Sequence, residues 1–153
     1  MPELSQQDFS QHFTNLIGRR VVFEKTLSKI DTKQKKIYAT YRSIPSEAPI
    51  VVVADLCVLG SLAGALVGLP DTEVQSRLAG PALDDLMNDA ISEIFNVATA
   101  MMTTEERAVF TSMSLDQASL ADAEAQVLAK PTRHVTFNIT VENYQGGRLQ
   151  IFT

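Results

Sequence analysis

The longest periodic segment of the chain is residues 82–102, ALDDLMNDAISEIFNVATAMM. Its apolar side chains recur every three or four residues, and its polar side chains fall on the other side of a helical projection. The apolar set is Leu83, Leu86, Ala90, Ile94, Val97 and Met101, and the polar set is Asp85, Asp89, Ser92, Glu93, Asn96 and Thr103. The pattern predicts one long amphipathic helix with one side on a core and the other in solvent.

Shorter patterns precede this segment. Ser5 followed by Asp8 is a typical helix start, and apolar residues at helical spacing continue until Gly18, which predicts a first helix. Residues 21–30 and 35–44 are rich in β-branched and aromatic side chains, and they predict two strands joined by the polar turn 31–34.

Residues 48–70, APIVVVADLCVLGSLAGALVGLP, carry a single charge, Asp55. The uncharged part, residues 56–69, is shorter than the roughly 20 residues that a membrane-spanning helix needs. The β-branched start at residues 50–53 favours a strand. The segment therefore predicts a buried hairpin, with strands at 50–58 and 64–69 and a connection at 60–63; a membrane helix is the alternative.

Glycines, prolines and helix-capping residues predict the bounds of the remaining helices and strands. A helix is predicted from Asp71 to the break at Gly80-Pro81, and Thr103 or Thr104 with Glu105-Glu106 predicts a further helix to about Met113. Residues 115–129 have high helix propensity but weak periodicity, and we leave them undecided. Residues 133–142 and 148–152 predict a closing hairpin. This order predicts one α+β domain over 1–153, a mainly antiparallel sheet with long helices packed on one face.

Composition narrows the class of protein. The 153 residues include 13 Lys+Arg, 18 Asp+Glu and one cysteine, Cys57, which is ordinary for a compact domain in a reducing compartment. The net charge of −5 argues against nucleic-acid binding, and residues 46–132 alone hold 13 acidic and three basic side chains. The N-terminal residues lack a basic region and an apolar run, so we expect a cytoplasmic protein without a secretory signal or membrane segment.

Most catalytic and metal-binding motifs are absent from the sequence. It has no P-loop, GxGxxG, HExxH, CxxC or GxSxG pattern. His12 and His134 lie in different predicted elements without a nearby cysteine or second histidine, so we interpret both as structural or surface residues. We expect no metal or cofactor of the protein's own.

One group of polar residues stands out on the long helix: Asp89, Glu93 and Asn96, in the pattern D-x3-E-x2-N. Helical spacing places the three side chains on one side, opposite the apolar stripe. A carboxylate and a carboxamide are thus presented together on a rigid element. An ordinary solvated helix surface is the alternative interpretation.

The stretch from Asp89 to Asn96 resembles the signature of the CheC/CheX family of chemotaxis phosphatases, in which D or S, x3, E, x2, N lies on a long surface helix. The glycine-rich apolar segment 51–69, the motif helix and the late strands also follow the family's order. One copy of the motif makes the chain most similar to CheX.

The resemblance implies a function and a partner. The substrate would be the aspartyl phosphate of a CheY-like response-regulator receiver domain, with Mg²⁺ bound by the receiver. Asn96 would hold the attacking water in line with phosphorus, Glu93 would pair with the receiver's lysine, and Asp89 would support the acidic side. The resemblance also implies a homodimer, for which exposed edge strands are a route.

The sequence departs from the family pattern in two places. Ser119 stands where the family commonly has a proline 23 residues after the asparagine, and Val97 to Met102 replace a glycine-containing turn. Two classes of function therefore stay open. One is a receiver phosphatase, favoured by the pair Glu93 and Asn96; the other is a noncatalytic interaction module with the same fold.

Overall fold

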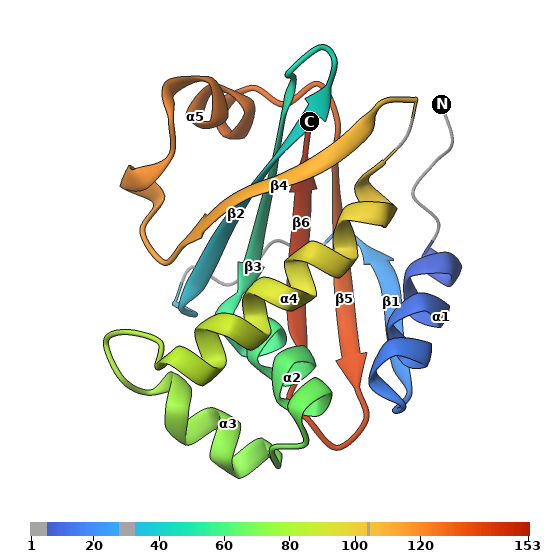
Figure 1. Cartoon of the computed structure of the whole chain (residues 1–153), viewed down its shortest axis with the longest axis vertical. Helices are drawn as coiled ribbons and strands as arrows, with labels where there is room; N and C mark the ends of the chain where they lie inside the picture. The colour runs from blue at the N-terminus through green and yellow to red at the C-terminus, as the bar shows by residue number, and fades with distance from the viewer. Residues whose placement is uncertain (1–5, 28–32, 104) are drawn as a thin grey trace.

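The computed structural model describes residues 6–27, 33–103 and 105–153. These residues form an α+β fold around a six-stranded sheet in the order β1-β5-β6-β3-β2-β4, in which every pairing is antiparallel (Figure 1). The strands are β1 Val21–Thr26, β2 Lys36–Ile44, β3 Pro49–Asp55, β4 Arg107–Ser114, β5 His134–Val141 and β6 Gly147–Phe152. The α-helices are α1 Gln6–Ile17, α2 Leu56–Val67, α3 Asp71–Leu78, α4 Asp85–Met102 and α5 Asp122–Ala129.

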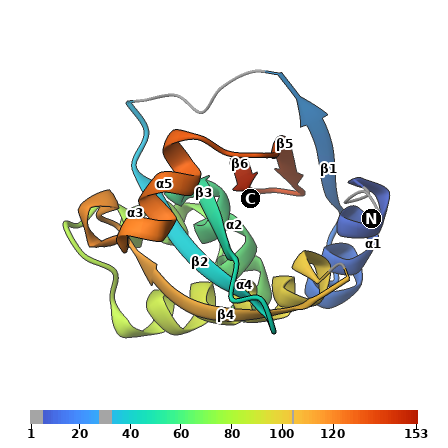
Figure 2. The same cartoon turned by 90° about the horizontal axis from the view of Figure 1, so that it is seen from above.

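The alternation of side chains along β3 separates the two faces of the sheet. Ile50, Val52 and Ala54 belong to the main core, which the long helices α1, α2 and α4 cover. Val51 and Val53 point to the opposite face of the sheet. There they pack with side chains of α5 and of the segment just before it. Figure 2 shows α5 and α4 on opposite sides of the sheet. The predicted fold class is confirmed, with a short helix added on the second face.

The predicted hairpin in residues 50–69 is wrong, because only its first half is a strand. β3 ends at Asp55 and the chain continues directly into α2. This helix is buried on nearly all sides, so it lacks the one-sided apolar pattern that identifies a surface helix. Gly60 and Gly64 face Val74 and Leu78 of α3, where a Cβ atom would be too close to those side chains.

A membrane-spanning helix is also absent from the part of the chain that the structure describes. α2 has 12 residues and ends at Gly68, whose positive φ of 80° closes the helix.

The predicted helix from Thr103 to about Met113 is wrong, because residues 107–113 belong to edge strand β4 beside β2. Glu106 does not cap a helix: its carboxylate accepts hydrogen bonds from the backbone N–H and the hydroxyl of Ser46, both at 2.7 Å. Thr103 accepts a hydrogen bond from the backbone N–H of Ala108 at 3.1 Å. Contacts distant in sequence therefore override the local capping pattern. Thr104 lies outside the described residues.

The undecided segment 115–129 forms a 3-10 turn, Gln117–Ser119, followed by α5. Leu120, Val127 and Leu128 pack on the β3 side chains Val51 and Val53. The other positions of the segment are mostly alanine and polar residues, which explains its weak periodicity.

The other predicted elements are confirmed, with bounds that differ by a few residues. α1 ends at Gly18, α3 starts at Asp71, and β5 and β6 form the closing hairpin. The two early strands, however, are not neighbours: β1 pairs with β5, and β2 lies between β3 and β4. The helix cap expected at Ser5 and the first half of the turn at 31–34 fall outside the described residues.

Candidate functional site

The candidate site lies on α4, which begins at Asp85 rather than at residue 82. Asp84 is its N-cap and accepts a hydrogen bond from the backbone N–H of Met87 at 2.8 Å. Its other carboxylate oxygen lies 3.1 Å from Nη1 of Arg77 on α3. The Met87 N–H, and then Arg77, hold the pKa of Asp84 below its ordinary range. The first turn of α4 is thereby tied to α3.

The buried side of α4 is rotated from the predicted stripe. Its members are Met87, Ala90, Ile91, Ile94, Phe95, Ala98 and Met102. Leu86, predicted to be in the core, is 43% exposed. The sequence offered apolar residues on more than half of the helix circumference, and only packing against the sheet and α2 selects which of them are buried.

The rotation leaves Asp89, Glu93 and Asn96 opposite the centre of the buried side. All three are exposed. None of them forms a hydrogen bond or an ion pair with any residue the structure describes. Side chains four and three residues apart on a helix have neighbouring Cβ atoms, so the carboxylate and the carboxamide lie side by side. The site is accessible and its polar groups are available to a partner.

The surroundings of these residues are acidic. Within residues 71–96 the acidic side chains are Asp71, Glu73, Asp84, Asp85, Asp89 and Glu93, against one basic side chain, Arg77. Arg77 already pairs with Glu73 at 3.0 Å and with Asp84 at 3.1 Å. The exposed side of α4 therefore favours a partner with a positive charge.

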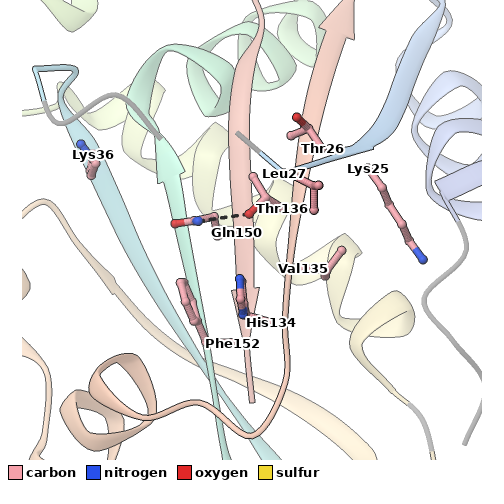
Figure 3. A pocket seen from close by; sticks show the side chains of 9 residues that line it. All are labelled: Lys25, Thr26, Leu27, Lys36, His134, Val135, Thr136, Gln150 and Phe152. Carbon is pink, nitrogen blue, oxygen red and sulfur yellow. Dashed lines mark hydrogen bonds between the residues drawn. The ribbon is translucent and has the colours of Figure 1, made fainter. Parts of the chain in front are cut away.

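The site is a convex helix surface and not a pocket. A hollow of about 740 Å³ lies on the sheet face that faces away from α4, and Asp89, Glu93 and Asn96 are not among its lining residues. Figure 3 shows its floor, where Gln150 donates a hydrogen bond to Thr136, with His134 and Phe152 below. Small-molecule sites are usually concave, so a convex polar surface fits a macromolecular partner better.

Metal-binding side chains do not gather anywhere in the described chain: no three His, Cys, Asp or Glu residues there could hold a metal ion together. His12 and His134 lie on α1 and β5, against Phe13 and Phe152 respectively, and neither belongs to α4. Burial raises the pKa of the Cys57 thiol, which favours the neutral form. The structure brings none of these residues to Glu93 and Asn96.

One residue next to the site could not be found from the sequence. Tyr41 of β2 is 54 positions before Phe95, yet its hydroxyl donates a hydrogen bond of 2.6 Å to the Phe95 carbonyl oxygen. The sequence carries no local signal of this contact, because it depends on the crossing of α4 over the sheet.

Comparisons with known proteins identify similar folds. No family model matches the chain, and no curated protein matches its sequence. Among solved structures, FliM in the FliM–SpeE complex from H. pylori has a TM-score of 0.68 at 10% identity, over 96% of this chain and 80% of that one. Thermotoga maritima FliY has a TM-score of 0.57 at 10% identity, over 94% and 81% of the two chains.

The chain has the FliM and FliY fold. At 10% identity this likeness concerns the fold alone. CheX in the CheX–CheY–BeF3–Mg²⁺ complex from Borrelia burgdorferi is more distant, with a TM-score of 0.48 at 10% identity over 97% and 96% of the chains. A likeness at that level supports no argument about function, so the CheX resemblance still depends on the residues of α4.

Proposed function

We propose that the protein is a phosphatase for the aspartyl phosphate of a CheY-like receiver domain. The observation that carries the proposal is that Glu93 and Asn96 lie together on the exposed side of α4, with no partner among the described residues. A carboxylate and a carboxamide at this spacing match the signature of the CheC/CheX phosphatases. Their exposure gives them access to a phosphorylated pocket in another molecule.

In the proposed reaction, water attacks phosphorus and the bond to the receiver's aspartyl oxygen breaks. The products are the free aspartate carboxylate and inorganic phosphate. Asn96 hydrogen-bonds the water and holds it in line; a neutral amide is a weak base, but it can orient a nucleophile, as glutamine does in small GTPases. Mg²⁺ on the receiver supplies charge neutralisation at the phosphoryl group, so this chain needs no metal of its own.

Glu93 docks the helix by pairing with a lysine of the receiver, and Asp89 adds negative charge one turn earlier. The acidic surface of α3 and α4 supports this assignment, since opposite charges speed the encounter and fix its register. Both carboxylates are unpaired within the described chain and are available for such a contact.

Replacement of the family proline by Ser119 does not alter the proposed site directly. Ser119 is in the 3-10 turn before Leu120, which packs on the sheet face opposite α4. Its position is compatible with activity at Glu93 and Asn96.

The alternative is a noncatalytic interaction module. The fold likeness to FliM favours it, since FliM is described in complex with another protein, SpeE. In that case the exposed side of α4 would bind a partner without hydrolysis.

A dephosphorylation assay separates the two functions. The protein is mixed with phosphorylated receivers from its own genome, and phosphate loss is followed against spontaneous decay. We expect faster decay with one or more receivers, no acceleration with Asn96→Ala, and a raised KM with Glu93→Ala. Asn88→Ala is the matched control, because Asn88 is an exposed asparagine of the same helix outside the motif.

Two results would contradict the proposal. One is wild-type protein that accelerates decay of none of the receivers, and the other is an Asn96→Ala variant as active as Asn88→Ala. Binding of a receiver without acceleration would support the interaction module.

A further inference from the structure

Tyr41 contacts the peptide group that carries Asn96. Its hydroxyl donates to the Phe95 carbonyl oxygen at 2.6 Å, and this carbonyl belongs to the same planar peptide unit as the Asn96 N–H. The hydroxyl of Thr99 also approaches the Phe95 carbonyl, at 3.3 Å. Tyr41, a side chain of the sheet, therefore holds α4 at the peptide group that precedes Asn96, the proposed water-orienting residue.

The hydrogen bond is strongly favoured because the tyrosine cannot reach water. Tyr41 is 1% exposed, and burial raises its pKa well above the ordinary range, so the hydroxyl remains a donor at all working pH values. A buried hydroxyl without a partner would carry a large desolvation cost. Tyr41 must therefore keep its bond to Phe95 for as long as the core is intact.

The sheet is locally irregular where Tyr41 leaves it. The register between β2 and β4 shifts between Thr40 and Tyr41, leaving Thr111 as an extra residue in β4. The Thr111 hydroxyl donates to the Thr40 carbonyl oxygen at 2.9 Å, which secures the bulge. Bulges redirect neighbouring side chains and occur beside functional sites.

Aromatic packing fixes the direction of the tyrosine. The ring of Phe110 lies 5.4 Å from that of Tyr41 and 5.7 Å from that of Phe95, between centroids. Phe110 therefore contacts both partners of the hydrogen bond, one from the sheet and one from α4. The bulge, the ring packing and the buried hydroxyl together form one rigid connection.

We infer that Tyr41 is a positioning residue for Asn96, acting through the Phe95 peptide group. This inference rests on the proposed phosphatase function. Orientation of a water molecule is sensitive to small displacements of the group that holds it. Docking through Glu93 depends mainly on charge and tolerates such displacements better. Loss of the Tyr41 hydroxyl should therefore lower kcat and leave KM nearly unchanged.

The test compares Tyr41→Phe with Tyr144→Phe. Tyr144 is the matched control because its hydroxyl also donates to a backbone carbonyl, that of Leu69, which lies after α2 and away from α4. Both variants lose one hydroxyl and keep their ring. At temperatures well below either melting transition, we expect kcat to fall roughly three- to tenfold in Tyr41→Phe, with unchanged KM, and to stay at the wild-type value in Tyr144→Phe.

A second measurement does not depend on activity. The ¹³C shift of the Phe95 carbonyl should move in Tyr41→Phe and stay unchanged in Tyr144→Phe. If that shift moves but both variants keep the wild-type kcat, the positioning role is rejected although the hydrogen bond exists. An inactive wild-type protein would instead reject the proposed function, so the two failures can be told apart.

Discussion

Asp84 stabilises the start of α4 as both a hydrogen-bond acceptor and a charge. Its carboxylate caps the Met87 N–H and pairs with Arg77, and these contacts lower its pKa. A carboxyl with a lowered native pKa contributes its full stability above its unfolded pKa, and loses it as the pH falls through the native value. The contribution of Asp84 should therefore be present at neutral pH and disappear in acid.

We predict that Asp84→Ala lowers Tm by a few degrees at pH 7, and that the difference from wild type narrows below about pH 4. Asp84→Asn is the control, because asparagine keeps the cap but cannot ionise. It should retain most of the stability and show less of the acid dependence. Calorimetry of the three proteins across this pH range is the measurement; a constant difference at all pH values would reject the assignment.

At the residue scale the sequence predicted where the candidate site residues lie on the helix, but not the contacts that hold the helix in place. Asp89, Glu93 and Asn96 could be placed on one polar side by helical spacing alone, and the structure leaves all three exposed. No local pattern indicates that Leu86 is exposed, nor that the Tyr41 hydroxyl donates a hydrogen bond to the Phe95 carbonyl oxygen. Those features depend on how α4 is rotated and where it crosses the sheet.

Among the elements, α2 shows how glycines permit close packing of two helices within one core. Gly60 and Gly64 are buried on the side facing α3, where Val74 is fully buried and Leu78 nearly so. A methyl group at Gly64 would overlap Val74 and force one of the helices to move. These glycines lie in the apolar segment for which a membrane helix is the alternative prediction, and they serve packing against α3.

We predict that Gly64→Ala destabilises the protein by about 1–3 kcal/mol through overpacking, measured by urea unfolding. Gly80→Ala is the control, because a methyl there meets only the Ala82 carbonyl oxygen at 3.6 Å; its effect should be within about 0.5 kcal/mol. The double variant Gly64→Ala with Val74→Ala should lose less unfolding free energy than the sum of the losses in the two single variants. If the two losses of unfolding free energy were strictly additive, the added methyl group at residue 64 would not be in conflict with the Val74 side chain.

Two elements differ from their sequence-based predictions, for different reasons. α2 lacks the usual pattern of a helix, and the residues before β4 carry a misleading one. The hairpin predicted over residues 50–69 is wrong in its second half because a fully buried helix lacks amphipathic periodicity and begins directly after a β-branched strand. The helix predicted from Thr103 to about Met113 is wrong because Thr103, Glu105 and Glu106 imitate a helix start. In the structure Glu106 binds the β2–β3 turn instead, a contact 60 residues away in sequence. Local signals cannot report such partners.

Across the whole molecule, the two edges of the sheet differ in how open they are. β1 is covered by α1: the backbone N–H groups of Val21 and Phe23 donate to the hydroxyls of Thr14 and Ser10, at 2.9 and 2.8 Å. β4 forms the other edge (Figure 1), with a single charged residue, Arg107, in its sequence. Edge strands without charges or a cover are ready to pair with another strand. The homodimer that the CheX resemblance implies would therefore use β4.

We predict that the protein is a dimer at micromolar concentration and that Val109→Lys, on β4, shifts it to monomer, because a lysine on an edge opposes strand pairing. Leu16→Lys on α1 is a matched control, since both residues are 37% exposed and Leu16 lies on the helix that covers the β1 edge. Sedimentation equilibrium gives the mass of each. A monomeric wild type, or dissociation by Leu16→Lys and not by Val109→Lys, would contradict a dimer through β4. Because α4 presents Glu93 and Asn96 away from the sheet, the monomeric variant should keep its activity toward a receiver.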